Sequence, residues 1–231
     1  MFKKFGVLGL TTLLLFTGAA TAKGVERYVA VSATGSVKVS PDSVRINATT
    51  YSSASSSKLA LSQTASASEK LRASLLANGI NKIYIKSNTI SVAPEYNYTQ
   101  DKGSVQIGYR ASQSFTVVVK NAANAGAVVD AIAAAGGDYL QLQGVSPFVL
   151  DNSKATEAAR AAAVKNAKAK AASYAKLMGV KLGKVNYLTE GGASYNPPVF
   201  GVAKAAADSA TVIDLGTQDV SVSISVQWAL I

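Results

Sequence analysis

The chain has 231 residues and a formal net charge of +10, with 23 Lys and Arg against 13 Asp and Glu. It contains no His and no Cys, which excludes a Ser-His-Asp triad, an imidazole base, a thiol nucleophile, a disulfide and the common zinc or iron–sulfur ligands. A hydrophobic content of 48% is typical of a chain that buries the core of one large domain or two small ones.

The N-terminus has the three parts of a secretory signal peptide. Lys3 and Lys4 precede an apolar run over 6–16, and Ala20-Thr21-Ala22 supplies a small-x-small cleavage pattern. The run is shorter than the roughly 20 residues that span a bilayer, and no later stretch is apolar enough for a transmembrane helix. We expect a signal peptide over 1–22 and one mature domain over 23–231, located in the periplasm or associated with the outer membrane. Removal of 1–22 takes two lysines away and leaves 209 residues with a charge of +8.

The first part of the mature chain is predicted to contain two strands and a helix. Valines at alternate positions flank Ser40-Pro41-Asp42, a turn signal that favours a hairpin. Serines within 52–57 are expected to cap a helix over 59–77, which Asn78-Gly79 ends. The helical spacing predicts one buried face made of Ala60, Thr64, Ala67, Leu71 and Leu75.

The middle of the chain is predicted to form a long pair of strands, a helix and a further strand. Alternating apolar residues over 83–98 and 107–119 surround a polar turn at 99–104. Pro94 lacks an amide proton, so it should lie at a sheet edge or a bulge. A helix follows over 121–135, ended by Gly136-Gly137, and then a strand over 139–150.

The last part contains the clearest helical pattern, over 154–178. Its buried face is expected to contain Ala163, Val164, Ala167, Ala171, Tyr174, Ala175 and Met178. A short strand over 185–188 and a loop over 191–210, with or without a short helix, come next. Strict alternation over 220–228 then predicts a strand with one buried face.

These elements predict an α+β fold in which mixed or antiparallel sheets are packed by about three helices, in the order ββ-α-ββ-α-β-α-β-β. Asn78-Gly79-Ile80 and Met178-Gly179-Val180 follow helices in a similar way. This repeated pattern suggests two hypotheses: an internal duplication of the chain, and a division of the mature domain into two α/β sublobes.

No motif for catalysis, a cofactor or a metal is present in the sequence. The carboxylates in or beside predicted turns and strand ends are Glu95, Asp101, Asp138, Asp151 and Glu190, and no spacing forces two of them together. No glycine-rich phosphate loop precedes a helix. We therefore expect no catalytic, cofactor-binding or metal-binding residues and no enzymatic activity, with a carboxylate hydrolase or lyase as the remaining enzymatic alternative.

Three groups of side chains are candidates for interaction surfaces. Tyr96, Tyr98 and Tyr109 lie on facing strands, where they either pack across the strands or form a binding platform or a subunit contact. In the 191–210 loop, apolar contacts to a second subunit would come from Tyr195, Pro197, Pro198 and Phe200. Lysines on another face of the last helix are either solvated or in contact with an anionic surface such as lipid head groups: Lys165, Lys168 and Lys176. No nucleic-acid module is present, so no nucleic-acid partner is expected.

Several short segments, in order along nearly the whole mature chain, resemble one family. They are Ala33-Thr34-Gly35 before Pro41-Asp42, Asn78-Gly79-Ile80, Pro94 to Tyr98, Gly108 to Ala111, Val145 to Leu150, the helix over 158–175, and Met178 to Val185. The chain is similar to the SIMPL-domain family, which includes YggE-like oxidative stress defence proteins and periplasmic immunogenic proteins of Gram-negative bacteria. This resemblance implies an exported α+β protein without established catalytic residues, loosely linked to oxidative stress, some of whose relatives assemble into ring- or channel-like homo-oligomers.

The combined expectation is a non-enzymatic exported protein that self-assembles and has a structural or envelope role, with an envelope partner of its own. The alternative is a binding module for a small ligand or an anionic surface. Met178 is the one sulfur atom of the mature chain, and the helical pattern places it on the buried face. Direct scavenging of oxidants is therefore not expected.

Overall fold

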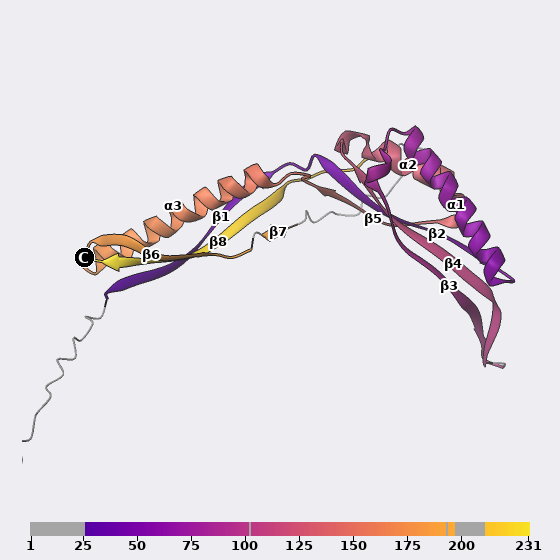
Figure 1. The fold of residues 1–231 in the computed structure, drawn as a ribbon, viewed down its shortest axis with the longest axis horizontal. Helices are drawn as coiled ribbons and strands as arrows, with labels where there is room; N and C mark the ends of the chain where they lie inside the picture. The colour runs from indigo at the N-terminus through magenta and orange to yellow at the C-terminus, as the bar shows by residue number, and fades with distance from the viewer. Residues whose placement is uncertain (1–25, 102, 193, 197–210) are drawn as a thin grey trace, which may run out of the picture.

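The computed structural model describes residues 26–101, 103–192, 194–196 and 211–231. Figure 1 shows an elongated, bent molecule with one lobe at each end. In both lobes the helices cover the convex side of an antiparallel sheet, and the other face of the sheet lies on the concave side. Two separate hydrophobic cores result, one under the helix or helices of each lobe.

The α3 lobe combines the first and last strands of the chain. Its sheet has the order β1 (Tyr28–Val39), β8 (Gln218–Leu230) and β6 (Leu182–Glu190), and the short β7 (Ser194–Asn196) also pairs with β8. Helix α3 (Ser153–Leu177) packs on β1 and β8. As the alternation predicts, the buried face of β8 carries Val220, Val222, Ile224, Val226 and Trp228.

The α1 lobe contains the middle of the chain. Its sheet has the order β3 (Ile85–Thr99), β4 (Gly103–Val119), β2 (Ser43–Ala54) and β5 (Leu140–Phe148). Helices α1 (Ser57–Ala77) and α2 (Ala125–Gly136) cover it, with single 3₁₀ turns at Lys82–Tyr84, Ala122–Asn124 and Gly137–Tyr139. Phe115, Leu71 and Ile132 are among its fully buried side chains.

The predicted fold class and element order are confirmed, with β7 as an additional strand. The predicted hairpin around Pro41 is wrong, because β1 and β2 belong to different sheets. The segment between them crosses from one lobe to the other. There the backbone oxygen of Asp42 accepts from the Ala122 amide and its carboxylate from the Leu150 amide, both at 2.9 Å. Alternating valines specify a strand but not its partner.

Within the described residues, the chain passes between the lobes again at 149–152 and 211–217. In the last crossing Ile213 and Leu215 pack against the core of the α1 lobe. The buried Gln218 side chain, at the start of β8, then donates to the Pro147 oxygen at 3.0 Å. Buried and polar contacts thus join two lobes whose cores are separate.

Helix α1 follows the sequence expectation closely. The Ser56 hydroxyl caps it by accepting from the Leu59 amide, and its predicted face is buried. Gly79 and Gly179 end α1 and α3 with φ of +78° and +69°, a backbone conformation that favours glycine. In both cases the next amide returns to the helix, from Ile80 to Leu75 and from Val180 to Ala175 at 3.0 Å. Internal duplication of the lobes stays a prediction.

Helix α3 contacts its sheet through a single column of alanines spaced four residues apart. The buried residues are Ala159, Ala163, Ala167, Ala171 and Ala175. The predicted burial of Val164, Tyr174 and Met178 is wrong, since they are 44%, 45% and 53% exposed. Because alanine side chains are small, the helix axis lies close to the strands and the contact is only one column of side chains wide. Residues beside this column, such as Val164 and Tyr174, therefore remain exposed to solvent.

Gly35 of β1 is where the sheet and α3 come closest. A Cβ atom at Gly35 would lie 2.1 Å from the Ala159 carbonyl oxygen and 2.2 Å from the Ala163 nitrogen. Real Cβ contacts are never that short. Beside this contact, Asn166 and Lys170 of α3 donate to the carbonyl oxygens of Thr34 and Ser32. These bonds occupy backbone acceptors of an edge strand, which hinders pairing with another chain.

The expectations for Pro94 and for the 191–210 loop have different outcomes. Pro94 lies on the edge strand β3, next to a register shift between Glu95 and Tyr96, as predicted. The loop prediction is wrong at Ser194–Asn196, which pairs with β8 as β7. Residues 197–210 lie outside the described part of the chain.

Candidate functional surfaces

The β3–β4 hairpin extends past the rest of its sheet. Strand β2 pairs with β4 only as far as the Ala54–Tyr109 pair, so β3 and β4 pair only with each other over 95–99 and 103–108. We call these two stretches the arm; it points away from the molecule in Figure 1. Its side chains include Tyr98 at 77% exposure, Ile107 at 61% and Tyr96 at 58%.

The structure separates the three predicted tyrosines. Tyr96 lies opposite Gln106 and Tyr98 opposite Ser104, whereas Tyr109 is half-buried opposite Pro94 at the base of the arm. None of the three is directly opposite another. The register therefore does not pair the three tyrosines with one another across the strands. Tyr96 and Tyr98 lie two residues apart on β3 and therefore share a face.

The second group of aromatic and proline residues is only partly described. Tyr195 lies in β7, in the α3 lobe and thus away from the arm. Its side chain, together with Pro197, Pro198 and Phe200, lies outside what the structure describes. A subunit contact through this segment therefore stays a prediction.

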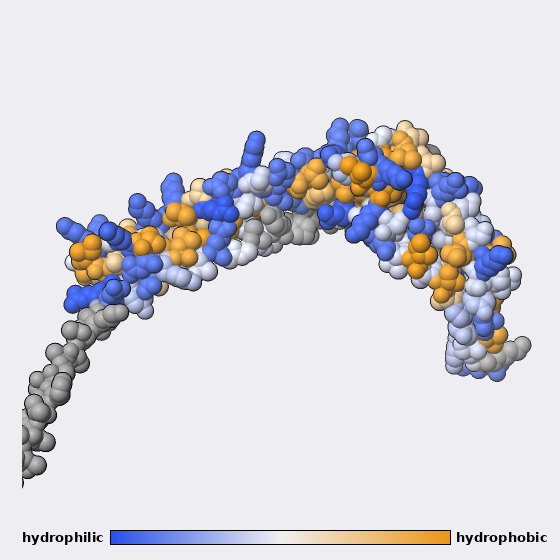
Figure 2. All heavy atoms as spheres, viewed as in Figure 1, coloured by the Kyte–Doolittle hydropathy of each residue, from blue (hydrophilic) through white to orange (hydrophobic). Residues whose placement is uncertain are grey.

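The three predicted lysines lie on the exposed face of α3, away from the alanine column. Lys165, Lys168 and Lys176 are all exposed, and Figure 2 shows hydrophilic side chains along the outer side of this lobe. No acidic residue occurs in α3 after Glu157. The C-terminal half of the helix therefore has an uninterrupted positive face, with cations close to the negative end of the helix dipole.

Arg160 brings together two carboxylates that the sequence reasoning did not connect. Its Nε and Nη2 donate to Glu190 of β6 at 2.7 and 2.9 Å, and its Nη1 donates to Glu157. The hydrogen bonds from Arg160 hold the pKa of Glu190 below its ordinary value, and the bonds that Arg160 donates to both carboxylates raise its own pKa. The i, i+3 spacing of Glu157 and Arg160 on a helix could have predicted their ion pair from the sequence, whereas the contact with Glu190 could not be predicted in this way.

The ion pair between Arg160 of α3 and Glu190 of β6 holds these two elements together. A guanidinium that bonds to both carboxylates and lowers the pKa of Glu190 favours an ion-pair role over proton transfer. The predicted turn carboxylate Asp151 has a local role as well, since it accepts from the Ser153 amide at 2.9 Å at the start of α3. This hydrogen bonding lowers the pKa of Asp151. Within the described residues no group of three or more acidic side chains is placed to hold a metal ion.

We expect Glu190→Gln to lower the thermal unfolding midpoint at neutral pH but not in acid. Because the folded-state pKa of Glu190 lies below its ordinary value of 4.5, the unfolded chain takes up the proton first as the pH falls. The ion pair therefore contributes stability above about pH 4.5, and this contribution is lost as the pH falls through the folded-state pKa. Circular dichroism melts at both pH values measure the effect.

A matched control is Glu69→Gln, because Glu69 is exposed on α1 and forms no ion pair among the described residues. This variant should melt like the wild type at neutral pH. An equal loss for Glu190→Gln at neutral and acidic pH would contradict the assigned role of the ion pair.

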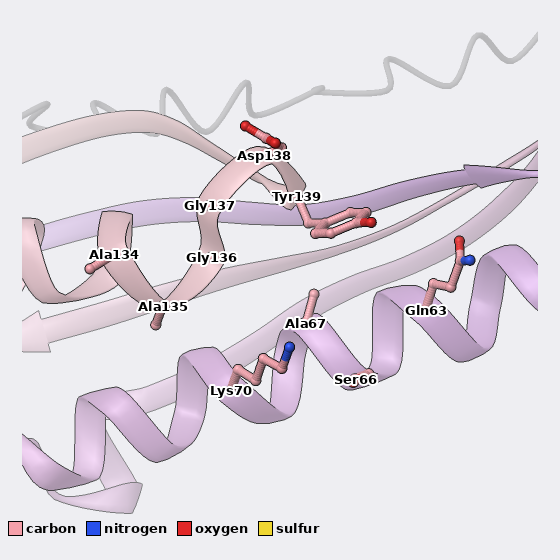
Figure 3. A pocket seen from close by; sticks show the side chains of 10 residues that line it. All are labelled: Gln63, Ser66, Ala67, Lys70, Ala134, Ala135, Gly136, Gly137, Asp138 and Tyr139. Atoms are coloured by element: carbon pink, nitrogen blue, oxygen red, sulfur yellow. The ribbon is translucent and has the colours of Figure 1, made fainter.

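A hollow of about 360 Å³ separates α1 from the end of α2. In Figure 3, Gln63 and Lys70 point from α1 toward the turn after α2, and the Tyr139 ring lies across the gap. Asp138 points away from α1, so Lys70 and Asp138 do not converge in this view. The hollow offers polar contacts to a small ligand without a paired nucleophile and base.

The concave face of the α3 lobe is a neutral surface of hydroxyl groups. Cross-strand pairs join Ser32 to Ser225 and Thr34 to Ser223 at 2.8 Å, and Ser221 donates to Ser36 at 3.0 Å. A shallow hollow of about 530 Å³ lies over the first two pairs and is lined by uncharged residues. The hydroxyls already bond to one another, which satisfies them on an open sheet face.

The fold places the chain in the class of elongated α+β proteins built from two lobes, each with a sheet covered by one helix or more. The sequence profile of SIMPL, described as a protein of unknown function (DUF541), matches residues 29–228, and the chain belongs to this family. The resemblance stated from the sequence is thereby confirmed.

The relatives that the chain matches have similar lengths. The 26 kDa periplasmic immunogenic protein of Brucella melitensis is 30% identical over 217 residues, covering 87% of this chain and 84% of the relative, and its counterpart in Brucella abortus gives the same values. The uncharacterized protein YggE of Edwardsiella ictaluri is 29% identical over 187 residues, covering 79% and 77%. Two of these names describe periplasmic proteins.

Proposed function

We propose that the protein is an exported, non-enzymatic component of the periplasm that assembles with copies of itself and has a structural or envelope role. The printed names of the Brucella relatives and the signal-like N-terminus support the location. In the described part of the chain, no helix has the length and hydropathy that crossing a membrane requires. The loose link to oxidative stress defence comes from the family resemblance.

The observation that carries self-assembly is the arm. A two-stranded ribbon is marginally stable by itself, yet this one exposes Tyr96, Tyr98 and Ile107 to solvent. Along the same edge strand, Ile90 and Val92 are exposed as well, at 60% and 39%. A long apolar edge strand is a template for pairing with another chain.

The charge of the arm favours a second copy as the partner. Residues 95–108 contain Glu95, Asp101 and Lys102 as their only charged residues, a balance of −1 in a chain of +10. Copies of a strongly basic protein repel one another elsewhere on their surfaces. The arm is a place where two copies approach without that repulsion.

Exposure of Met178 changes the argument about oxidants. At 53% exposure its sulfur is open to oxidation, so the expectation based on its burial does not hold. One sulfur per mature chain gives at most one oxidation event per molecule. We therefore keep the proposal of a structural role and assign no scavenging function.

We expect the exported protein to form an oligomer at tens of micromolar, and the double variant Tyr96→Thr/Tyr98→Thr to dissociate. Threonine keeps the strand propensity and removes the aromatic contact area. Loss of a buried interface tyrosine raises the dissociation constant by at least about tenfold. Light scattering coupled to size-exclusion chromatography gives the mass.

The control is Tyr139→Thr, which removes a tyrosine of comparable exposure, 51%, away from the arm. It should leave the mass unchanged. A strictly monomeric wild type would count against self-assembly itself, and an unchanged mass for the folded double variant would count against the arm as the contact.

A binding module for a small ligand or an anionic surface is the second candidate function. The exposed lysines of α3 favour the anionic-surface version.

A further inference from the structure

The far end of the α3 lobe exposes large apolar side chains. Helix α3 ends there, and the chain turns through Gly179 into β6 beside the last strand. Leu177 is 79% exposed, Ile231 78% and Met178 53%. We call this group the tip; Figure 2 shows apolar and hydrophilic side chains together at this end of the molecule.

The backbone holds the parts of the tip together. The amides and carbonyls of Lys181 and Ile231 bond reciprocally at 2.7 and 2.9 Å, and the Leu230 amide donates to the Arg27 carbonyl at 2.9 Å. The Ile231 side chain lies against Gly183. The tip is therefore a fixed end of a sheet and a helix, with its apolar side chains facing outward.

Exposed cations lie next to these apolar side chains: Arg27, Lys176, Lys181 and Lys184. Lys176 and Lys181 are within five residues of Leu177 and Met178, and the Arg27 carbonyl accepts from the Leu230 amide. Lys184 follows Gly183, which lies against the Ile231 side chain. Among the described residues, none of the four cations forms an ion pair with a carboxylate. In the described part of the chain, Glu26 is the acidic side chain next to this group, and the four cations outnumber it.

We propose that the tip binds the surface of an anionic phospholipid bilayer, with Leu177, Met178 and Ile231 entering the interface and Lys176, Lys181 and Lys184 contacting the head groups. Apolar side chains with lysines beside them match the layered polarity of a bilayer surface. Lysine stems lie along the apolar region while the ammonium groups reach the phosphates. The inference extends the second candidate function and does not depend on self-assembly.

Two further observations favour a bilayer over a second copy as the occupant. A symmetric contact between two tips would bring the same lysines against each other, which like-charge repulsion opposes. The described part of the chain also begins here, at residue 26, ten positions after the apolar run of the expected signal peptide. Before cleavage, that run would hold the tip close to the membrane.

The test is flotation of the exported protein with vesicles of phosphatidylcholine containing about one third phosphatidylglycerol, compared with phosphatidylcholine alone. We expect binding to the anionic vesicles only, weakened at about 0.5 M salt. The variant Lys176→Gln/Lys181→Gln/Lys184→Gln should lower partitioning at least about tenfold. Leu177→Ser/Met178→Ser should also lower partitioning, and should abolish the fraction of vesicle binding that persists at high salt.

The control for net charge is Lys58→Gln/Lys82→Gln/Lys86→Gln, three exposed lysines of the α1 lobe. It changes the total charge equally and should bind within about twofold of the wild type. Absence of binding to the anionic vesicles, equal losses for both lysine triples, or full binding by the serine variant would each overturn the proposal. The arm variant Tyr96→Thr/Tyr98→Thr should still bind vesicles, which keeps a failure of this proposal apart from a failure of self-assembly.

Discussion

Replacing Gly35 with alanine is expected to destabilise the α3 lobe by at least about 3 kcal/mol, the upper end of the usual cost of overpacking. The added methyl would meet the Ala159 oxygen and the Ala163 nitrogen at little more than 2 Å. These are backbone atoms of a helix, which cannot rotate away as a side chain does. The whole of α3 must therefore move off the sheet, and the alanine column loses its contacts with the strands.

The single tryptophan of the chain gives a direct measurement of this effect. Trp228 is buried in the core of the α3 lobe, so its emission during urea unfolding reports on that lobe. Gly144→Ala is the matched control, because Gly144 is also a strand glycine but has no atom within 4 Å of the added Cβ. A Gly35→Ala protein whose Trp228 transition coincides with that of the wild type would contradict the close approach of α3.

Replacing Phe115 with alanine is expected to cost the α1 lobe about 3–5 kcal/mol, the range for loss of a buried aromatic ring. Phe115 is 1% exposed in the core below α1, and the Arg72 guanidinium lies 5.3 Å from its ring centre. The cavity cannot close easily, because β4 is held on both sides by β3 and β2. Loss of helical circular dichroism from α1 and α2 measures the effect.

The two variants together test whether the lobes unfold separately. Because each lobe has its own core, we expect Phe115→Ala to lose part of its helical signal before the Trp228 emission changes, and Gly35→Ala to show the opposite order. As a control, Leu61→Ala, at a position 43% exposed on α1, should shift neither the helical signal nor the Trp228 emission. Coincident transitions in both core variants would show instead that the crossings, such as the bond from Gln218 to Pro147, couple the lobes into one unit.

Local patterns predicted most elements of this fold. The four-residue spacing of Ala60, Thr64 and the later members of that face located the buried side of α1, and Ser56 and Gly79 marked its ends. Strict alternation located the buried side of β8. These features depend on residues a few positions apart, so the sequence around each element contains the information.

Partners of the strands could not be predicted in the same way. The valines of β1 pair with residues of β8 such as Val226, and nothing near Pro41 indicates this. The width of the contact under α3 was also missed, because a helical wheel does not show how closely Gly35 lets the helix approach. Burial of Met178 was consequently predicted wrongly, and with it the exposed tip was missed.

For the candidate surfaces, residue types were easier to predict than their positions. Alternation placed Tyr96 and Tyr98 on a strand, but the arm exists only because β2 ends its pairing at Ala54. The lysines of α3 were predicted to be exposed and are. Their continuation to Lys181 and Lys184 depends on how the chain turns after the helix, which requires the tertiary structure.

The nesting of one lobe inside the other along the chain sets an order for folding. Strands and helices of the α1 lobe occupy one continuous stretch, 43–148, and of the later residues that the structure describes, Ile213 and Leu215 pack against its core. In contrast, Ser32 and its partner Ser225 are 193 positions apart. The first strand of the chain must therefore stay unpaired until the last one is available. High contact order slows such closure, so we expect β1 to be among the last strands to pair.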